Sequence, residues 1–351
     1  MSKQEVIISR QLDESLSLAV SQCPHDKRFI LTDTHTRQLC LPLINRLPCL
    51  EGSEIITIGA GDEHKTLDSL AAVWNELSSR GGSRHSLLLN LGGGMVTDLG
   101  GFAASTFKRG ITYINLPTTL LAMVDAAVGG KTGINFNGLK NEVGVFNPAR
   151  FVLLDTGFLR SLDDANLCSG YAEMLKHGLI STEEHWAELL NFDLEHPDYQ
   201  LLQDLVARSV AIKEHIVEQD PYEKGIRKAL NLGHTVGHAF ESLALEEGHP
   251  RLHGYAVAWG MVCELYLSTL RTGFPKDKLR QTVQFIKETY GTFAFDCKQY
   301  DRLYAFMTHD KKNEGGHINF TLLGDVGDLR INQTAGKEEI FEMLDFYREA
   351  M

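Results

Sequence analysis

The chain has 351 residues, enough for two domains of ordinary size, and its 43% hydrophobic and 23% charged residues are typical of a globular rather than a disordered protein. Its formal net charge of −12 excludes a general electrostatic attraction to nucleic acid or to an anionic membrane. A local cluster of Lys and Arg side chains would therefore be needed to hold an anionic small-molecule substrate against that charge.

The cysteines and the N-terminal residues bear on the cellular compartment. Six cysteines are scattered along the chain without a Cys-x-x-Cys pair, so we expect reduced thiols rather than a disulfide framework. The N-terminus shows no apolar core of a signal peptide, and no apolar run reaches the roughly 18–20 residues that would span a bilayer. We therefore expect a cytoplasmic protein with neither a membrane nor a nucleic-acid partner.

Up to about residue 155, short β-rich runs alternate with helical patterns. One helix is predicted over residues 66–81, where apolar residues recur at helical spacing and glycines follow. Strands that alternate with helices predict parallel βαβ units, and hence an α/β domain. The predicted strands cover residues 29–31, 54–58, 86–91, 112–116 and 151–154.

After about residue 160 the pattern becomes mainly helical. The sequence predicts two domains, an α/β domain with a parallel sheet over residues 1–160 and a mainly α-helical domain over residues 161–351. Helices are predicted over residues 201–218, 228–245 and 256–270, and a short pair of strands over 317–323 and 328–331.

A glycine-rich turn at Gly92, Gly93 and Gly94 follows an apolar strand and opens a helix. Consecutive glycines let backbone N–H groups approach an anion, and the helix N-terminus adds the positive end of its dipole. The spacing is not the Gly-x-Gly-x-x-Gly of dinucleotide-binding folds, and such glycines are also common packing devices. We interpret the turn as a diphosphate site. Asp98 falls in the first turn of this helix, where a carboxylate can simply act as a cap.

A second glycine-rich stretch, residues 128–135, carries Lys131 between its glycines. A cation beside exposed backbone N–H groups favours a phosphate ligand. The stretch does not have the spacing of a Walker A motif, so a P-loop kinase is not expected.

Four histidines, His234, His238, His249 and His253, fall within twenty residues. Clustered imidazoles with one carboxylate form a common zinc-binding set. His234 and His238, four residues apart, would share one helix face and could both bind the metal. Glu173 is the candidate carboxylate, although with Lys176 it could also form an ordinary surface ion pair.

These stretches together resemble the 3-dehydroquinate synthase family of sugar-phosphate cyclases. The matching segments run in family order from residue 92 to residue 316, and weaker matches reach back to Asp33 and Gly61. Most of the chain is therefore covered. The segments are GGGMVTDLGGFAASTFKRG, LPTTLLAMVDAAVGGKTGIN, LKNEVGVFNP, YAEMLKHGLI, RKALNLGHTVGHAFE, HGYAVAWGM and HDKKNEGG.

The resemblance implies an N-terminal NAD-binding α/β domain and a C-terminal helical domain that binds Zn²⁺, with Co²⁺ as a possible substitute. The implied metal ligands are Glu173, His234 and His253, which removes His238 from the ligand set and leaves it a hydrogen-bonding or proton-transfer role. Arg109 matches an arginine that reaches a neighbouring subunit's active site, which implies a homodimer.

The other implied catalytic residues are Asp125, Lys131, Asn141, Lys176, Arg227 and Asn231. The substrate-binding residues would be Lys140, Lys213 and one or both of Lys311 and Lys312, together with Arg109. The cofactor-binding residues would be Asp33, Asp62, Lys65, Gly93, Gly94, Asp98, Thr118, Thr119, Asp125, Lys131 and Lys140.

The sequence departs from the family pattern at a few positions. Thr97 stands where the family commonly has Gly, Asp62 where it has a longer Glu, and Tyr255 where it has a Glu beside the metal ligand. Ala126 and Ala127 replace two serines. None of these departures removes a residue to which we assign chemistry.

The implied reaction converts 3-deoxy-D-arabino-heptulosonate 7-phosphate to 3-dehydroquinate and phosphate in the shikimate pathway of aromatic amino-acid biosynthesis. Bound NAD⁺ would take a hydride from C5 and return it after phosphate is eliminated, and ring opening and an aldol closure would follow.

Three other interpretations differ in what they require. A metal-dependent alcohol dehydrogenase of the glycerol dehydrogenase kind has no need of so many phosphate-binding cations. Cyclases acting on sedoheptulose 7-phosphate or glucose 6-phosphate have substrates without a carboxylate, whereas Arg227 and Asn231 favour a substrate that carries one. A nucleotide-binding pseudoenzyme should lack at least one metal ligand.

Overall fold

The computed structural model describes residues 4–309 and 318–351, so Lys311 and Lys312 lie outside the described residues. The chain divides into two compact units. The first comprises residues 1–163 with 198–210, and the second residues 164–197 with 211–351. The assignment of cofactor binding to residues 1–160 and of metal binding to residues 161–351 stays a prediction.

The first unit is built on a six-stranded sheet in the order β1-β8-β5-β4-β2-β3, in which every paired strand is parallel. The predicted parallel sheet is confirmed, with β1 as an edge strand that was not expected. β4 is buried along its whole length, as a central strand covered on both faces should be. The strands are β1 (Glu5–Ile8), β2 (Arg28–Asp33), β3 (Glu54–Ile58), β4 (Leu87–Gly92), β5 (Thr112–Pro117) and β8 (Phe151–Leu154).

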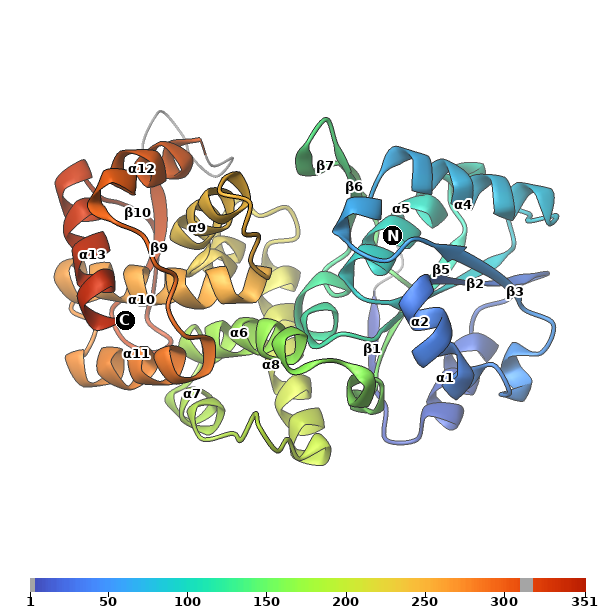
Figure 1. Cartoon of the computed structure of the whole chain (residues 1–351). Coiled ribbons are helices and arrows are strands. Elements are labelled where there is room, and N and C mark those ends of the chain that lie inside the picture. The colour runs from blue at the N-terminus through green and yellow to red at the C-terminus, as the bar shows by residue number, and fades with distance from the viewer. Residues whose placement is uncertain (1–3, 310–317) are drawn as a thin grey trace. The chain divides into compact units, whose positions relative to one another are not determined.

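Helices cover both faces of this sheet. Helices α4 and α5 lie on one face and α1 and α2 on the other (Figure 1). The strand order reverses between β2 and β4, and ligands of open α/β sheets bind outside the carboxyl ends of the strands at such a reversal. The helices are α1 (Leu12–Ser21), α2 (Thr34–Leu39), α3 (Leu41–Ile44), α4 (Leu67–Ser79) and α5 (Gly94–Thr106).

A hairpin of β6 (Lys131–Phe136) and β7 (Leu139–Phe146) follows the second glycine-rich stretch and was not expected from the sequence. Its turn is Asn137-Gly138, both with positive φ (50° and 77°), which is the commonest sequence of a two-residue hairpin turn. Lys131 is therefore the first residue of a strand and does not lie inside a loop. Every residue of β7 is exposed, which weakens the apolar alternation that would have revealed the strand.

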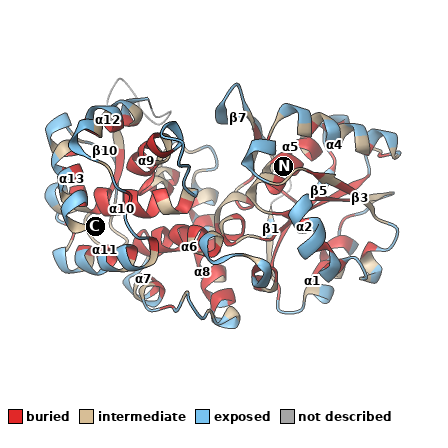
Figure 2. Cartoon of the chain, viewed as in Figure 1, coloured by how far each residue is buried: buried red, intermediate tan, exposed pale blue. Residues whose placement is uncertain are grey.

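The second unit is helical, with one β-hairpin. The long helix α10 packs against α6, α9, α11 and α13 and is buried over most of its length (Figure 2). The elements are α6 (Asp164–Leu179), α7 (Glu183–Leu190), α9 (His234–Glu246), α10 (His253–Arg271), α11 (Lys276–Tyr290), α12 (Tyr300–Thr308), α13 (Lys337–Ala350), β9 (Asn319–Leu323) and β10 (Leu329–Thr334). Helix α8 (Tyr199–Gln219) begins in the first unit and ends in the second.

The single helix predicted over residues 228–245 is wrong. A 3₁₀-helix, η6 (Ile226–Asn231), precedes α9, and the two are separated at Gly233, whose φ is 80°. A side chain at Gly233 would also meet the backbone oxygen of Val257 at 2.8 Å. The helical periodicity of the apolar residues continues across the break, so the periodicity alone could not reveal it.

No helix in the described ranges is both long enough and apolar enough to cross a membrane.

Candidate active site

Three helices of the second unit bring one carboxylate and two imidazoles together. Glu173 of α6 is completely buried, His234 of α9 nearly so, and the side chain of His253 of α10 is 28% exposed. Oε1 of Glu173 lies 3.4 Å from Nε2 of His234 and 3.4 Å from Nε2 of His253. The three ligand atoms all lie within 4.8 Å of one another.

This spacing fits a metal ion better than it fits hydrogen bonds. Oε1 of Glu173 is buried and accepts no hydrogen bond from any described residue, and an orphaned buried oxygen is rare. Two ligand atoms bound at about 2.05 Å to a tetrahedral zinc lie roughly 3.4 Å apart. The chemistry of the set, two imidazole nitrogens and one carboxylate oxygen, also suits zinc and leaves a fourth position for a substrate oxygen.

The second nitrogen of each imidazole is held by a hydrogen-bond acceptor. Nδ1 of His234 lies 3.1 Å from the backbone oxygen of Leu232, and Nδ1 of His253 lies 3.3 Å from Oε2 of Glu241. A proton on each Nδ1 satisfies these contacts and leaves both Nε2 lone pairs directed at Glu173. This tautomer is the one that a metal requires.

The electrostatics around Glu173 keep it ionised. Burial by itself raises the pKa of a carboxyl group, but the cationic Lys176 and the two imidazoles hold the pKa of Glu173 well below its usual range. Burial lowers the pKa of His253, yet its contacts with Glu173 and Glu241 raise it to about 10. A dipositive ion at this point would replace the proton on Nε2 of His253 as the partner of Glu173, and Nδ1–H would stay bonded to Glu241.

The three helices that carry the candidate metal ligands approach one another closely at glycines, which brings the ligands to one point. A Cβ atom at Gly254 would lie 1.8 Å from the backbone oxygen of Ser169, and one at Gly260 would lie 1.9 Å from that of Gly233. Glycine is therefore required where α10 meets α6 and where it meets the start of α9.

Glu264 of α10 is a buried carboxylate that accepts hydrogen bonds from the first N–H groups of α9. Its Oε2 accepts from Gly233 at 2.7 Å, and its Oε1 accepts from Thr235 at 3.0 Å and from Val236 at 3.2 Å. A carboxylate at a helix N-terminus also stabilises the helix dipole. Glu264 thereby links the helix of His234 to the helix of His253.

Of the other two histidines in the predicted cluster, one lies at this centre. The ring of His238 is 5.4 Å from that of His234 and 5.9 Å from that of His253, but His238 is not one of the three converging ligands. His249 is exposed and is not part of the centre.

Three of the cations predicted in the second unit, Lys176, Lys213 and Arg227, are buried, so none of these three lies on the surface. Lys176 is 1% exposed and donates a hydrogen bond to Glu173, so the pair is not an ordinary surface ion pair. Lys213 is 5% exposed and does not lie on a solvated helix face. Buried cations of this kind are normally paired or hydrogen-bonded. Their roles toward a substrate stay predictions.

Arg227 is 3% exposed and lies on η6, not on the helix of His234. In a 3₁₀-helix a turn takes three residues, so Arg227 and Asn231, four residues apart, do not share a face of η6. Nη1 of Arg227 donates to the backbone oxygen of Pro221 at 2.7 Å, and Nδ2 of Asn231 donates to Oε1 of Glu223 at 3.0 Å.

In the first unit, the glycine-rich turn lies where the strand order reverses. Gly92 ends β4, Gly93 is the N-cap of α5, and no described side chain caps this helix. Its first N–H groups are therefore placed to bind an anion. A Cβ at Gly93 would lie 3.0 Å from the side chain of Thr119, and Thr118 donates its backbone N–H to the oxygen of Gly92 at 3.0 Å. Thr118 and Thr119 therefore lie beside the glycines, and their contact with a cofactor stays a prediction.

Lys65 connects three segments of this unit. It is 4% exposed, and its Nζ lies 2.5 Å from Oδ2 of Asp98 and also donates to Oδ1 of Asn141 on β7. Asp98 lies in the second turn of α5 and not in the first, so a capping role for it is wrong. Asn141 has a positive φ of 51°, a conformation that such specific contacts can maintain.

Two more of the predicted cofactor residues, Asp33 and Asp62, lie at the end of β2 and shortly after the adjacent strand β3. Oδ1 of Asp33, at the end of β2, caps α2 by accepting from His35 and Thr36 at 2.8 and 2.7 Å. Asp62 is exposed in the 3₁₀-helix η2 (Asp62–His64), where Oδ2 accepts from Nδ2 of Asn135 at 3.2 Å. Their contacts with a ribose or adenine stay predictions.

Three other predicted site residues lie in unusual backbone conformations or at exposed positions: Asp125, Arg109 and Lys140. Asp125 is in a π-helical turn, η4 (Ala122–Ala126), a type that is frequent at functional sites. Arg109 is exposed and, like Lys108, has a positive φ (71° and 49°). Lys140 is exposed on β7.

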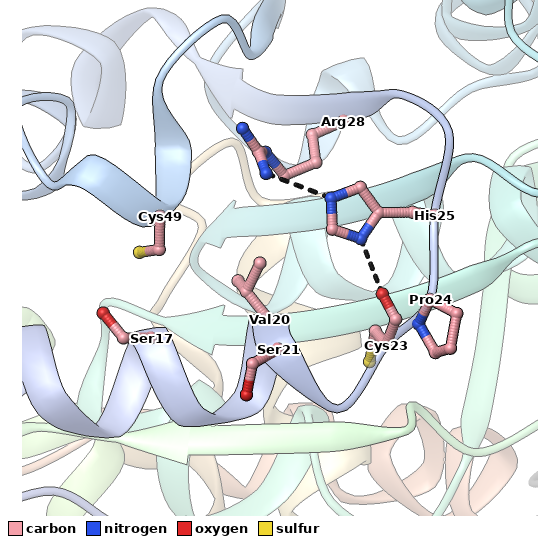
Figure 3. A pocket seen from close by; sticks show the side chains of 8 residues that line it. All are labelled: Ser17, Val20, Ser21, Cys23, Pro24, His25, Arg28 and Cys49. Atoms are coloured by element: carbon pink, nitrogen blue, oxygen red, sulfur yellow. Dashed lines mark hydrogen bonds between the residues drawn. The ribbon is translucent and has the colours of Figure 1, made fainter.

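A cavity of about 400 Å³ in the first unit lies at the amino end of β2, whereas the predicted cofactor site lies at the carboxyl ends of the strands (Figure 3). Arg28, which opens β2, donates to Nε2 of His25 at 3.0 Å, and Nδ1 of His25 lies 2.6 Å from the oxygen of Cys23. These groups satisfy one another at the amino end of the strand, whereas ligands of such sheets bind at the carboxyl ends. The lining residues are Ser17, Val20, Ser21, Cys23, Pro24, His25, Arg28 and Cys49.

Two carboxylates that bond to the candidate metal ligand His253 or to the helix of His234 were missed from the sequence. Glu241 follows His234 by seven residues and His238 by three, a spacing that places all three on one helix face, and this signal could have been used. Glu264 lies eleven residues beyond His253, and only the packing of α9 on α10 reveals its role.

Solved structures of similar fold place the chain in a class. A 2-epi-5-epi-valiolone synthase from Streptomyces hygroscopicus subsp. jinggangensis, solved with NAD⁺ and Zn²⁺ bound, superposes over 100% of this chain and 98% of its own, with a TM-score of 0.87 and 26% identity. A 2-deoxy-scyllo-inosose synthase superposes over 100% of this chain and 97% of its own, with a TM-score of 0.84 and 23% identity. The chain therefore has the dehydroquinate synthase-like cyclase fold, and the predicted fold class is confirmed.

Sequence comparison is more specific. The family models described as 3-dehydroquinate synthase N-terminal and C-terminal match residues 55–169 and 170–313. A 3-dehydroquinate synthase from Parabacteroides distasonis is 59% identical over 350 residues, which cover 100% of this chain and 99% of the relative. The chain belongs to the 3-dehydroquinate synthase family, as the resemblance implied.

Proposed function

We propose that this chain converts 3-deoxy-D-arabino-heptulosonate 7-phosphate to 3-dehydroquinate and phosphate, and so acts as a carbon–oxygen lyase. The observation that carries the proposal is the convergence of Glu173, His234 and His253 on one point, in a chain matched by both family models. The 59% identical relative is named for this activity.

The centre at Glu173, His234 and His253 would hold Zn²⁺, or Co²⁺ in its place. A metal bound there would polarise substrate hydroxyl groups and lower their pKa. The protein's contribution is to keep Glu173 ionised through Lys176 and to keep both imidazoles in the tautomer with Nε2 free for the ion. His238 would exchange a proton with a hydroxyl held at the centre, and the nearness of its ring to both His234 and His253 supports this role.

NAD⁺ would be held at the carboxyl ends of β2 and β4. NAD⁺ bound there would supply a hydride acceptor and, once reduced, a hydride donor. The N-terminus of α5 and the glycines before it would receive the diphosphate, and Asp33 at the end of β2 would bind a ribose. The Lys65–Asp98 pair fixes α5 against the hairpin through Asn141, which supports this cradle.

The cationic residues would supply the local positive charge that a −12 chain needs for a substrate with a phosphate and a carboxylate. They are Lys131 and Lys140, both exposed on the β6–β7 hairpin of the first unit, and Lys176, Lys213 and Arg227 in the second unit. The family match supports these roles, and so does the burial of the last three.

We further propose a homodimer in the cytoplasm, in which Arg109 reaches the active site of the second copy. Lys108 and the exposed Arg109 both have a positive φ, so the turn that they form is strained. Such strain is retained mainly where the surrounding structure and function require it. Arg109→Ala should lower activity without changing metal content.

The cofactor should be needed in catalytic amounts only, because the hydride that leaves the substrate returns to it. With NAD⁺ at one-hundredth of the substrate concentration, phosphate release should run to completion, and absorbance of NADH at about 340 nm should not grow with product. A chelator should stop the release. NADH that accumulated in proportion to product would identify a dehydrogenase and contradict the proposal.

Arg227→Ala tests whether Arg227 binds an anionic group of the substrate. A charge-assisted bidentate contact is worth about 1.5–3 kcal/mol, so kcat/KM should fall by about one to two orders of magnitude. Because Arg227 is buried and bonded to Pro221, stability should also fall, by about 1–3 kcal/mol. Lysine at this position should recover little activity, since it lacks the planar fork.

The matched control is Lys228→Ala, which removes the neighbouring cation bonded to Asn332. It should leave kcat/KM within about twofold of the wild type. Wild-type kcat/KM in Arg227→Ala would show that Arg227 has only a structural role.

A further inference from the structure

The ring of His253 has a carboxylate at each of its nitrogens. Nε2 is 3.4 Å from Oε1 of Glu173, and Nδ1 is 3.3 Å from Oε2 of Glu241. If Nε2 binds a metal, Nδ1 must carry the ring proton, and a carboxylate is the strongest neutral-pH acceptor for it. Glu241 is in the position from which it can accept that proton as a hydrogen bond.

Glu241 is itself held in place by the helix that carries the other histidines. His234, His238 and Glu241 occupy one face of α9 at intervals of four and three residues. The N-terminus of this helix is tied to α10 by the buried Glu264. The carboxylate of Glu241 is only 17% exposed, so water screens its charge weakly.

The two ligand histidines differ in how they are fixed. His234 has a side chain only 11% exposed, and it donates Nδ1–H to a backbone oxygen, that of Leu232. The side chain of His253 is 28% exposed, so packing restrains it less. His253 is therefore the ligand whose orientation depends on another side chain.

We propose that Glu241 is a positioning residue that orients His253 and increases its strength as a metal ligand through the hydrogen bond from Nδ1–H. The proposal rests on the proposed function, because it assumes that the Glu173–His234–His253 centre binds a metal. Carboxylates that accept from a ligating imidazole typically increase metal affinity by about 10–100-fold. Glu241 does not itself contact the metal.

Two substitutions and one control separate this role from general stability. Glu241→Ala removes the acceptor, and Glu241→Gln keeps an acceptor oxygen but removes its charge. The control is Glu246→Gln, which changes an exposed carboxylate at the end of the same helix, paired with Arg302. The zinc dissociation constant and the zinc release rate are measured by competition with a chelator, and the visible absorption spectrum is recorded for the Co²⁺ proteins.

We expect Glu241→Ala to weaken zinc binding and to speed its release by about 10–100-fold, and Glu241→Gln to have a smaller effect. Both variants should alter the Co²⁺ spectrum, whereas Glu246→Gln should match the wild type within about twofold. Excess zinc should recover much of the lost turnover in both variants.

The possible failures are distinguishable. If the wild-type chain binds no metal at all, the proposed function fails together with the inference. If the wild type binds zinc and both Glu241 variants bind it equally tightly with an unchanged Co²⁺ spectrum, only the inference is overturned. A lower melting temperature of the metal-free variants with unchanged zinc affinity would likewise overturn it, because Glu241 would then serve stability alone.

Discussion

Replacing His253 with alanine is expected to abolish metal binding at micromolar zinc and, with it, most of the phosphate release from the heptulosonate phosphate. Two of the three converging ligand atoms would remain, those of Glu173 and His234, and zinc sites normally use at least three protein ligands. Loss of a group that only orients a ligand weakens binding about 10–100-fold, so loss of the ligand itself should weaken it by more than about 100-fold. Turnover should fall by about 10²–10³-fold or more.

Zinc content after dialysis and the rate of phosphate release measure this effect. The matched control is His249→Ala, because His249 belongs to the same cluster in sequence but is exposed and lies outside the centre. It should bind zinc and turn over at the wild-type level. Full zinc occupancy with retained activity in His253→Ala would contradict the assignment of the centre.

Replacing Gly260 with alanine should cause the largest loss of stability among the single substitutions considered. The new Cβ would lie 1.9 Å from the backbone oxygen of Gly233 and 2.6 Å from the backbone nitrogen of Gly237. Neither atom belongs to a flexible side chain, so α9 and α10 must separate. Overpacking of this kind costs about 3 kcal/mol, which corresponds to a fall of roughly 6–12 °C in Tm for a unit of this size.

Zinc affinity should fall in the same variant, because His234 and His253 lie on the two helices that are pushed apart. Thermal unfolding followed by circular dichroism measures the first effect and chelator competition the second. Leu270→Ala, at the exposed end of the same helix, is the control and should cost less than about 1 kcal/mol. Equal melting temperatures for the two variants would mean that the helices do not approach as closely as described.

Most of the regular elements could be predicted from local patterns. The β3 and β8 strands have the predicted limits, and α4 lies within the helix predicted over residues 66–81, because apolar spacing and flanking glycines are local properties. The hairpin of β6 and β7 was missed since its second strand is exposed on both faces. The break at Gly233 was missed because its cause, contact with Val257 and Met261, is a tertiary one.

The sequence by itself determined which residue types are available and where they stand in chain order. Strand–helix alternation predicted the parallel sheet, and the motifs indicated the family and the set of Glu173, His234 and His253. These conclusions depend on periodicity and on residue identity, both of which can be read without coordinates.

Only the tertiary structure decided how these residues act on one another. It placed the oxygen of Glu173 3.4 Å from two imidazole nitrogens and buried Lys176, Lys213 and Arg227. It also brought Glu241 to His253, and Glu264 to the first N–H groups of α9, as hydrogen-bond acceptors. These relations depend on the packing of α6, α9 and α10 at glycines distant in sequence. Such contacts set the distances between helices, and the sequence pattern along one helix cannot predict these distances.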